Sequence, residues 1–166
     1  MDANDHFVAL QNRVLDRLTA DDPEVPAPAA ANGAVKFLTE QMGNLESMVA
    51  EAVASLGIVA IVLTPTALMI DPRVPGLGMY APVLVQIQED VMINQAEGGT
   101  KIPALRLVSF VMKRLQNFSH RLYAGDESSQ RLLLDPKPFV LIRDETPLTY
   151  NVAATAMLDL SAALRS

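Results

Sequence analysis

The residues with the strongest potential for chemistry are Glu97 to Lys101, with the sequence EGGTK. Glycines let backbone N–H groups approach an anion, and the start of a helix favours negative charge, so this segment could cradle a phosphate. A P-loop has the order G-x-x-x-x-G-K-[ST], with the lysine before the hydroxyl residue. Here Thr100 precedes Lys101, and the first glycine of the motif is missing. We therefore interpret the segment as a strand-to-helix turn, with phosphate binding as the alternative.

Two histidines and no cysteine limit the metal and nucleophile chemistry of the chain. Neither His6 nor His120 lies in a ligand motif such as H-E-x-x-H, so we predict two surface histidines and no metal site. Without cysteine there is no disulfide and no thiolate nucleophile. No serine occurs in a G-x-S-x-G motif either. The sequence predicts no enzyme, no catalytic residue and no cofactor.

Adjacent acidic residues occur four times, as Asp21-Asp22, Glu89-Asp90, Asp126-Glu127 and Asp144-Glu145. Neighbours on a strand point to opposite faces, so Glu89 and Asp90 cannot act together on one substrate without a bulge. We interpret the other three pairs as solubilising charges in loops. An enzyme that uses carboxylates distant in sequence, as glycosidases do, is the catalytic alternative.

The composition favours a single domain that cannot cover all of its apolar surface with polar groups. The 166 residues are 50% apolar but only 19% charged, below the roughly 25% that is usual. With so few charges, some apolar area is expected to contact other subunits, with a compact monomer as the alternative. The net charge of -6 argues against a protein that grips nucleic acid.

The most apolar segment, residues 57–70, has 14 residues and contains Pro65. A membrane-spanning helix needs about 20 residues, so we expect this segment to be buried core. The N-terminus lacks the basic and apolar regions of a secretory signal. The prediction is a chain with no membrane contact.

In the N-terminal half, residues 5–19 have helical spacing, with Asp5 as a cap and Phe7, Leu10, Val14 and Leu18 on one face. Residues 21–33 hold three prolines and predict an extended connection, so this helix is either an arm or packs back on the core. Residues 34–56 predict one long helix that ends at Gly57. Its stripe comprises Leu38, Met42, Leu45, Val49, Val53 and Leu56. Residues 58–63 predict a central strand, 67–71 a short second strand and 72–78 a loop.

Two long alternations dominate the C-terminal half, residues 82–94 and 148–160, and we predict that they pair antiparallel. Glu89 falls in the apolar register, which indicates a bulge, a turn to solvent or a subunit contact. Residues 100–117 predict a helix with Thr100 as N-cap. Its inward side chains should be Ile102, Leu105, Val108, Met112 and Leu115. After a loop at 120–130, strands at 131–135 and 139–143 flank a Pro-Lys-Pro step.

Positive charge gathers on the helix predicted at 100–117, from Lys101, Arg106, Lys113 and Arg114. We interpret these side chains as a solvated face, with docking to an acidic patch of a neighbouring copy as the alternative. The order of elements predicts an α+β fold, a mostly antiparallel sheet flanked by two or three helices. Residues 1–33 form the first helix and its connection, and residues 34–166 the α+β domain.

The chain resembles the tail terminator or tail-completion proteins of tailed bacteriophages. The likeness is carried by the long strand, Gly-Thr turn and helix in VLVQIQEDVMINQAEGGTKIPALRLVSFVMKRL, the hairpin region RLLLDPKPFVLIR, and the strand TPLTYNVAATAML. It covers residues 34 to 160 as an order of elements. The resemblance implies a homohexameric ring in the tail or neck of the virion, assembled in the host cytoplasm. One end would meet the tail tube protein and the other the head-tail connector or neck protein.

On this resemblance the work is assembly, and DNA passes through the channel without specific binding, helped by an acidic wall. Another phage neck, tube or baseplate component is the nearest alternative, and a small anion- or ligand-binding domain is a more distant one. We predict that the long strand and the turn after it contact other subunits. The predicted interface residues are Gln86, Gln88, Asp90, Glu97, Gly98, Gly99, Thr100 and Lys101.

Overall fold

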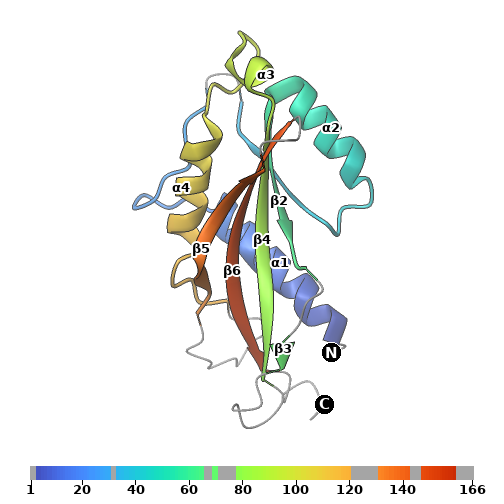
Figure 1. Ribbon diagram of the computed structural model, residues 1–166, viewed down its shortest axis with the longest axis vertical. Coiled ribbons are helices and arrows are strands. Elements are labelled where there is room, and N and C mark those ends of the chain that lie inside the picture. Colours follow the sequence, from blue (N-terminus) through green and yellow to red (C-terminus); the bar gives the residue numbers. More distant parts are fainter. Residues whose placement is uncertain are drawn as a thin grey trace.

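The computed structural model describes residues 3–30, 33–65, 69–70, 78–120, 131–142 and 147–159. These residues form a six-stranded, mostly antiparallel sheet with four helices, so the predicted α+β class is confirmed (Figure 1). In chain order the elements are α1 Ala3–Thr19, β1 Lys36–Thr39, α2 Leu45–Leu56, β2 Ile58–Leu63, β3 Met69–Ile70, β4 Gly78–Glu89, α3 Val91–Gln95, α4 Ala104–Leu115, β5 Leu133–Ile142 and β6 Leu148–Asp159.

The sheet is organised around β4 and β6. Its strand order is β1-β2-β4-β6-β5, and β3 pairs with the start of β4. Only β1 and β2 run parallel; the other pairs are antiparallel. Every residue of β4 is in register with one of β6, from Gly78 opposite Asp159 to Glu89 opposite Leu148. The predicted antiparallel pairing of the two alternations is therefore confirmed.

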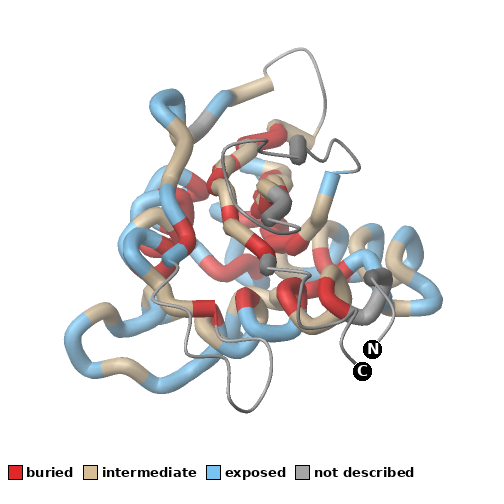
Figure 2. The backbone as a smooth tube through the Cα atoms, turned by 90° about the horizontal axis from the view of Figure 1, so that it is seen from below, coloured by how far each residue is buried: buried red, intermediate tan, exposed pale blue. Residues whose placement is uncertain are grey.

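One face of this sheet is covered by α1 and α4. Alternate residues of the two long strands, among them Val85, Ile87 and Val152, pack in one buried cluster with Leu10 of α1 and Leu107 of α4. Buried residues accordingly concentrate between the sheet and the helices, whose outer turns are exposed (Figure 2). Of the two alternatives for the first helix, the structure has the one in which it packs back on the core.

The helix α2 lies on the opposite face, over β1 and β2. Ala52 packs there with Val59 and Ile61 in a second, smaller cluster. Both faces of β2 are thus covered, and the central strand predicted from its unbroken apolar run is confirmed. Gly57, with φ of 75°, ends α2 as predicted.

The single helix predicted for residues 34–56 is wrong in its first half. Residues 36–39 form β1, which pairs with β2 so that Leu38 lies opposite Ile61 and is buried. Gly43 and Asn44 separate this strand from α2, which begins at Leu45. Four residues are too few to show a strand's period of two, so the spacing of Leu38 to Leu45 matched a helix by chance.

The strand predicted to reach residue 94 ends at Glu89. There the Asp90 side chain accepts a hydrogen bond from the Ile93 backbone N–H at 3.1 Å and caps the short helix α3. Val91 and Ile93 continue the alternation in sequence only, because one helical turn is too short to reveal its own period.

The two strands predicted around the Pro-Lys-Pro step form one strand, β5. Its register against β6 shifts between Leu134 and Phe139. Pro136 and Pro138 lack backbone N–H groups, so the shift lies where the ladder could not continue regularly. The loops predicted at 72–78 and 120–130 lie outside the described residues except for Gly78, which begins β4, and His120. Residues 67–68, 71, 143 and 160 of the predicted strands also lie outside them.

A reciprocal arginine contact joins the ends of α1 and α4. The Arg17 guanidinium donates to the Arg114 carbonyl at 3.0 Å, and that of Arg114 donates to the carbonyls of Arg17 at 3.2 Å and Ala20 at 2.9 Å. Asp22 accepts from Arg17 at 3.0 Å and lies 3.5 Å from Arg114. Arg114 is fully buried, over the Phe110 ring. The solvated position predicted for Arg114, and the merely solubilising role for Asp22, are therefore wrong.

We expect Asp22→Asn to destabilise the protein in a pH-dependent way. The backbone N–H of Glu24 and two guanidinium groups lower the pKa of Asp22. A carboxylate with a lowered folded pKa stabilises the fold above about pH 4, and this effect is lost as the pH falls through the folded value. The variant should therefore have a lower urea midpoint at pH 7, and the difference should shrink as the pH falls below about 4. Asp21→Asn, at the exposed neighbouring position, should show no such trend; equal pH profiles for the two variants would contradict the contact.

Candidate functional site

No helix covers β4, β5 and β6 on the face opposite α1 and α4, within the part of the chain that the structure describes. The period of two places Leu84, Gln86 and Gln88 of β4 on this open face, next to Asn151 and Ala153 of β6. Most of these side chains are partly exposed, and Leu133 and Val140 of β5, on the same face, are each 55% exposed. We call this surface the open face.

The described side chains of β4 and β6 that lie on the open face carry no charge. The described side chains of β4 and β6 that lie on it are Tyr80, Pro82, Leu84, Gln86, Gln88, Thr149, Asn151, Ala153, Thr155 and Met157. The amides hydrogen-bond to one another: Gln86 donates to Asn151 at 3.3 Å and accepts from Gln88 at 2.9 Å. Amides that satisfy one another can be covered at low cost, because no charge must be desolvated.

A groove borders the open face beside α2. Its volume is about 440 Å³, and it is mainly apolar. Its walls are Glu46, Val49, Ala50, Val53 and Ala54 of α2, Ile93 of α3, Gln88 and Pro147. Since aliphatic atoms dominate these walls, the groove suits protruding aliphatic side chains rather than a charged ligand.

The turn after β4 is held by a buried polar network centred on Asn94. The Asn94 amide donates to the Glu89 carboxylate at 2.6 Å and to the Ile102 carbonyl at 2.8 Å, and it accepts from the Thr100 hydroxyl at 2.6 Å. The carboxylate also accepts from the Ala104 backbone N–H at 3.4 Å, where α4 begins and its dipole favours negative charge. Glu89 therefore forms no bulge and does not turn to solvent.

This arrangement does not support a phosphate cradle in the segment EGGTK. The backbone N–H groups of Gly99, Thr100 and Lys101 all donate to carbonyl oxygens of the chain, at 2.9 to 3.2 Å. They are consequently engaged within the turn. Thr100 is not the N-cap of α4, because the helix begins at Ala104 and Pro103 holds the N-cap position. The strand-to-helix turn is the interpretation that the geometry favours.

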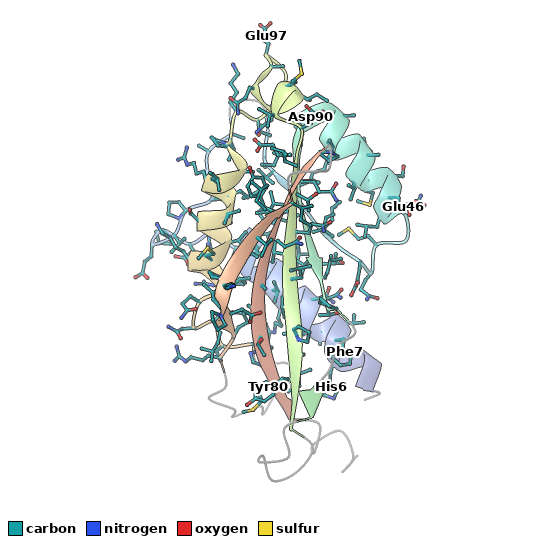
Figure 3. The ribbon with its side chains drawn as sticks, in the orientation of Figure 1. His6, Phe7, Glu46, Tyr80, Asp90 and Glu97 are labelled. Carbon is teal, nitrogen blue, oxygen red and sulfur yellow. The ribbon has the colours of Figure 1, made fainter. Side chains whose placement is uncertain are left out.

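The predicted interface residues divide between the open face and the end of the molecule. Gln86 and Gln88 lie on the open face, whereas Asp90 and Glu97 lie with α3 at one end of the elongated chain (Figure 3). Gly98 and Lys101 are exposed, but Gly99 and Thr100 are buried within the chain and shape the turn. Their contact with other subunits stays a prediction.

Sequence patterns missed Met92, which is 85% exposed on α3 beside the half-exposed Val91. Both positions were assigned to the long strand, and no local signal marks the end of that strand except the capping residue Asp90. Leu105, predicted to point inward, is 55% exposed. These apolar side chains add to the surface available for a partner.

Both histidines were predicted at the surface, and both predictions are wrong. His6 is 2% exposed and His120 is 3% exposed. His6 lies one helical turn before Leu10 on the buried stripe of α1, a spacing that the sequence already contained. The His120 Nε2 lies 2.8 Å from the carbonyl oxygen of Met157. In the described part of the chain, no three His, Asp or Glu side chains come together as metal ligands would.

None of the helices within the described ranges has the length and apolarity required to cross a membrane. No protein-family model matches the chain, and no curated protein is significantly similar to it.

We expect Gly57→Ala to disrupt the contact between α2 and the Asn94 network. A Cβ on Gly57 would lie 2.1 Å from the Asn94 backbone nitrogen, and the φ of 75° strains any side chain. Urea unfolding should show a loss of at least about 2 kcal/mol. Gly43→Ala is the matched control, since nothing lies within 4 Å of its added Cβ. It should change stability by less than about 1 kcal/mol, and equal losses in both variants would contradict the tight packing at Gly57.

Proposed function

We propose that the chain is a structural protein of a tailed-bacteriophage virion, a subunit of a closed ring that ends the tail tube and joins it to the neck. Six copies are the expected number, and the protein works by shape rather than by making bonds. The proposal combines the resemblance in the order of elements with the fold described above. The observation that carries it is the open face, a broad sheet surface, uncharged on the described residues of β4 and β6 that lie on it, which a sister copy can cover.

The energetic reason lies in the apolar side chains of that face. Leu133 and Val140 are half exposed on β5, on the same face as partly exposed Leu84 and Met157. Fully burying one such side chain contributes about 1.5–3 kcal/mol, so covering a few of them can sustain a stable contact. The side chains that the described residues of β4 and β6 present on the open face carry no charge, which keeps the desolvation cost low.

The edges of the sheet favour association through faces. The strand β5 contains Pro136 and Pro138 and shifts its register, features that discourage the addition of another strand. At the other edge, β1 has only four residues, and α1 packs beside it. Strand addition at an edge can continue without limit, whereas contacts between faces can close into a ring.

In this ring one end would meet the tail tube protein and the other the head-tail connector or neck protein. A net charge of -6 lets DNA pass without sticking, because like charges repel. Another neck, tube or baseplate component belongs to the same class and shares these features. The two are separated by how the copies assemble, since a tube polymerises along its axis and a terminator forms one closed ring.

We expect the purified protein to form rings of one size. Sedimentation velocity and native mass spectrometry should give a single closed oligomer, six copies by expectation, and electron microscopy should show isolated rings that bind the ends of tail tubes. Open-ended stacks would instead indicate a tube component. A chain that stays monomeric at high micromolar concentration would contradict the proposal.

A charge at the centre of the open face should block assembly without unfolding the chain. Ala153 lies there on β6, opposite Leu84. In Ala153→Arg the guanidinium must be desolvated on contact, so we expect the ring dissociation constant to rise at least about tenfold. Circular dichroism and urea unfolding should match the wild type. Ala29→Arg, at an exposed position of the proline-rich connection, should leave the ring intact. A ring that persists in Ala153→Arg would exclude the open face from the contact.

A further inference from the structure

The outer face of α4 and the segment that precedes this helix carry basic side chains. Lys101, Arg106 and Lys113 are exposed, and residues 101–117 contain no acidic side chain. Arg114 does not belong to this face, because it is buried against the end of α1. Beside Arg106, Leu105 projects with 55% of its surface exposed. The outer face of α4 is therefore an aliphatic knob, Leu105, with Arg106 and Lys113 along one side of it, where they line a pocket together with Glu24.

The outer face of α2 is acidic and built from small side chains. Residues 41–56 contain no lysine or arginine, and Glu46, Ala50 and Ala54 follow one another at intervals of four residues on an exposed row. That row lines the groove of about 440 Å³ beside the open face. Glu51, on the next row, is paired with Lys36 at 3.2 Å. The groove is therefore an aliphatic recess with a carboxylate, that of Glu46, in its lining.

These two complementary surfaces lie on opposite flanks of the same chain. Figure 1 shows α4 on one side of the sheet and α2 on the other. Glu46 lies on the flank away from α4 (Figure 3). One copy cannot bring its own knob to its own groove, because the sheet stands between them. A second copy can, and the contact then repeats from copy to copy.

We propose that α4 of one copy docks into the groove beside α2 of the next copy, with Leu105 in the groove and Arg106 and Lys113 beside Glu46. This inference rests on the proposed ring and assigns the elements that build it. The contact is heterologous, since two different surfaces meet, and heterologous contacts form closed rings when their rotation closes. The docked α4 also extends over Gln88, and so covers part of the open face of its neighbour.

The apolar contact and the ionic contacts of this proposed interface have different roles. Burial of Leu105 supplies affinity, because its side chain leaves water on entering a mainly apolar groove. Exposed ion pairs add little affinity, but opposite charges fix orientation and speed encounter, and like charges oppose docking. Charge reversal is for this reason a sharp probe of which surfaces meet.

The test uses Arg106→Glu, Glu46→Arg and their combination in one chain. Each single variant should raise the ring dissociation constant at least about tenfold in sedimentation velocity, and the combination should return it to within about threefold of wild type. Lys137→Glu and Asp16→Arg are exposed matched controls for the change in charge, and they should assemble normally. All five variants should keep the wild-type urea midpoint within the scatter of surface substitutions.

Mixing the two single variants distinguishes a lost contact from misfolding, because misfolded variants would not assemble when they are combined. The new glutamate on α4 of one variant should accept the new arginine on α2 of the other, and the next contact around the ring is then the natural one. Equimolar mixtures should therefore form rings of alternating subunits, which native mass spectrometry resolves by mass. Only an even number of copies permits such a ring.

Three outcomes would overturn the inference, and they are distinguishable from failure of the proposed ring. Wild-type rings that persist unchanged in both single variants would leave the ring proposal standing and exclude this contact. A wild-type chain that is monomeric at every concentration would remove both. Retention of duplex DNA by the wild type, lost in Arg106→Glu while rings are unaffected, would assign the α4 face to nucleic acid instead.

Discussion

A sheet has two faces, and in the described part of this chain helices cover one of them along the long strands and the other only over β1 and β2. The helices α1 and α4 bury the inward residues of β4 and β6, whereas α2 protects only Val59, Ile61 and their neighbours. The remaining surface is half exposed, uncharged on the described residues of the long strands, and bordered by an apolar groove. The proposed ring follows from this uncovered surface, because a second copy of the chain can supply the layer that packs against it.

Two buried polar clusters make the exposed surfaces rigid. At one end of α4, Arg114 is tied to the carbonyls at the end of α1. At the other, the Glu89 carboxylate accepts the Ala104 N–H and holds the Asn94 network. Fixed at both ends, α4 presents its basic outer face at a defined angle to the sheet. A rigid surface loses little conformational entropy on docking, which favours a single ring geometry over a mixture of assemblies.

Strong periodicity in the sequence predicted much of the fold. The wrong predictions share one cause, which is the shortness or interruption of the elements concerned. The helix α1, the strand β2 and the pairing of β4 with β6 were predicted correctly because each shows its period over several repeats. The helix predicted at 34–56, the overlong strand to residue 94 and the divided β5 failed where elements are short or interrupted by proline. At the site, the period of two placed Gln86 and Gln88 on one face, whereas the burial of Thr100 and the exposure of Leu105 and Met92 depended on neighbours distant in sequence.

By itself, the sequence determined which residues alternate, which helix carries only positive charge and how few charges cover the surface, because these are properties of the order and type of side chains. Tertiary structure alone decided that α2 shields β1 and β2 while the described residues of β4 to β6 stay open on that face, and that the basic and acidic helices lie on opposite flanks. The physical reason is that cover, distance and facing depend on how separate elements pack together. Local patterning specifies each element's apolar side but not the element that will lie against it.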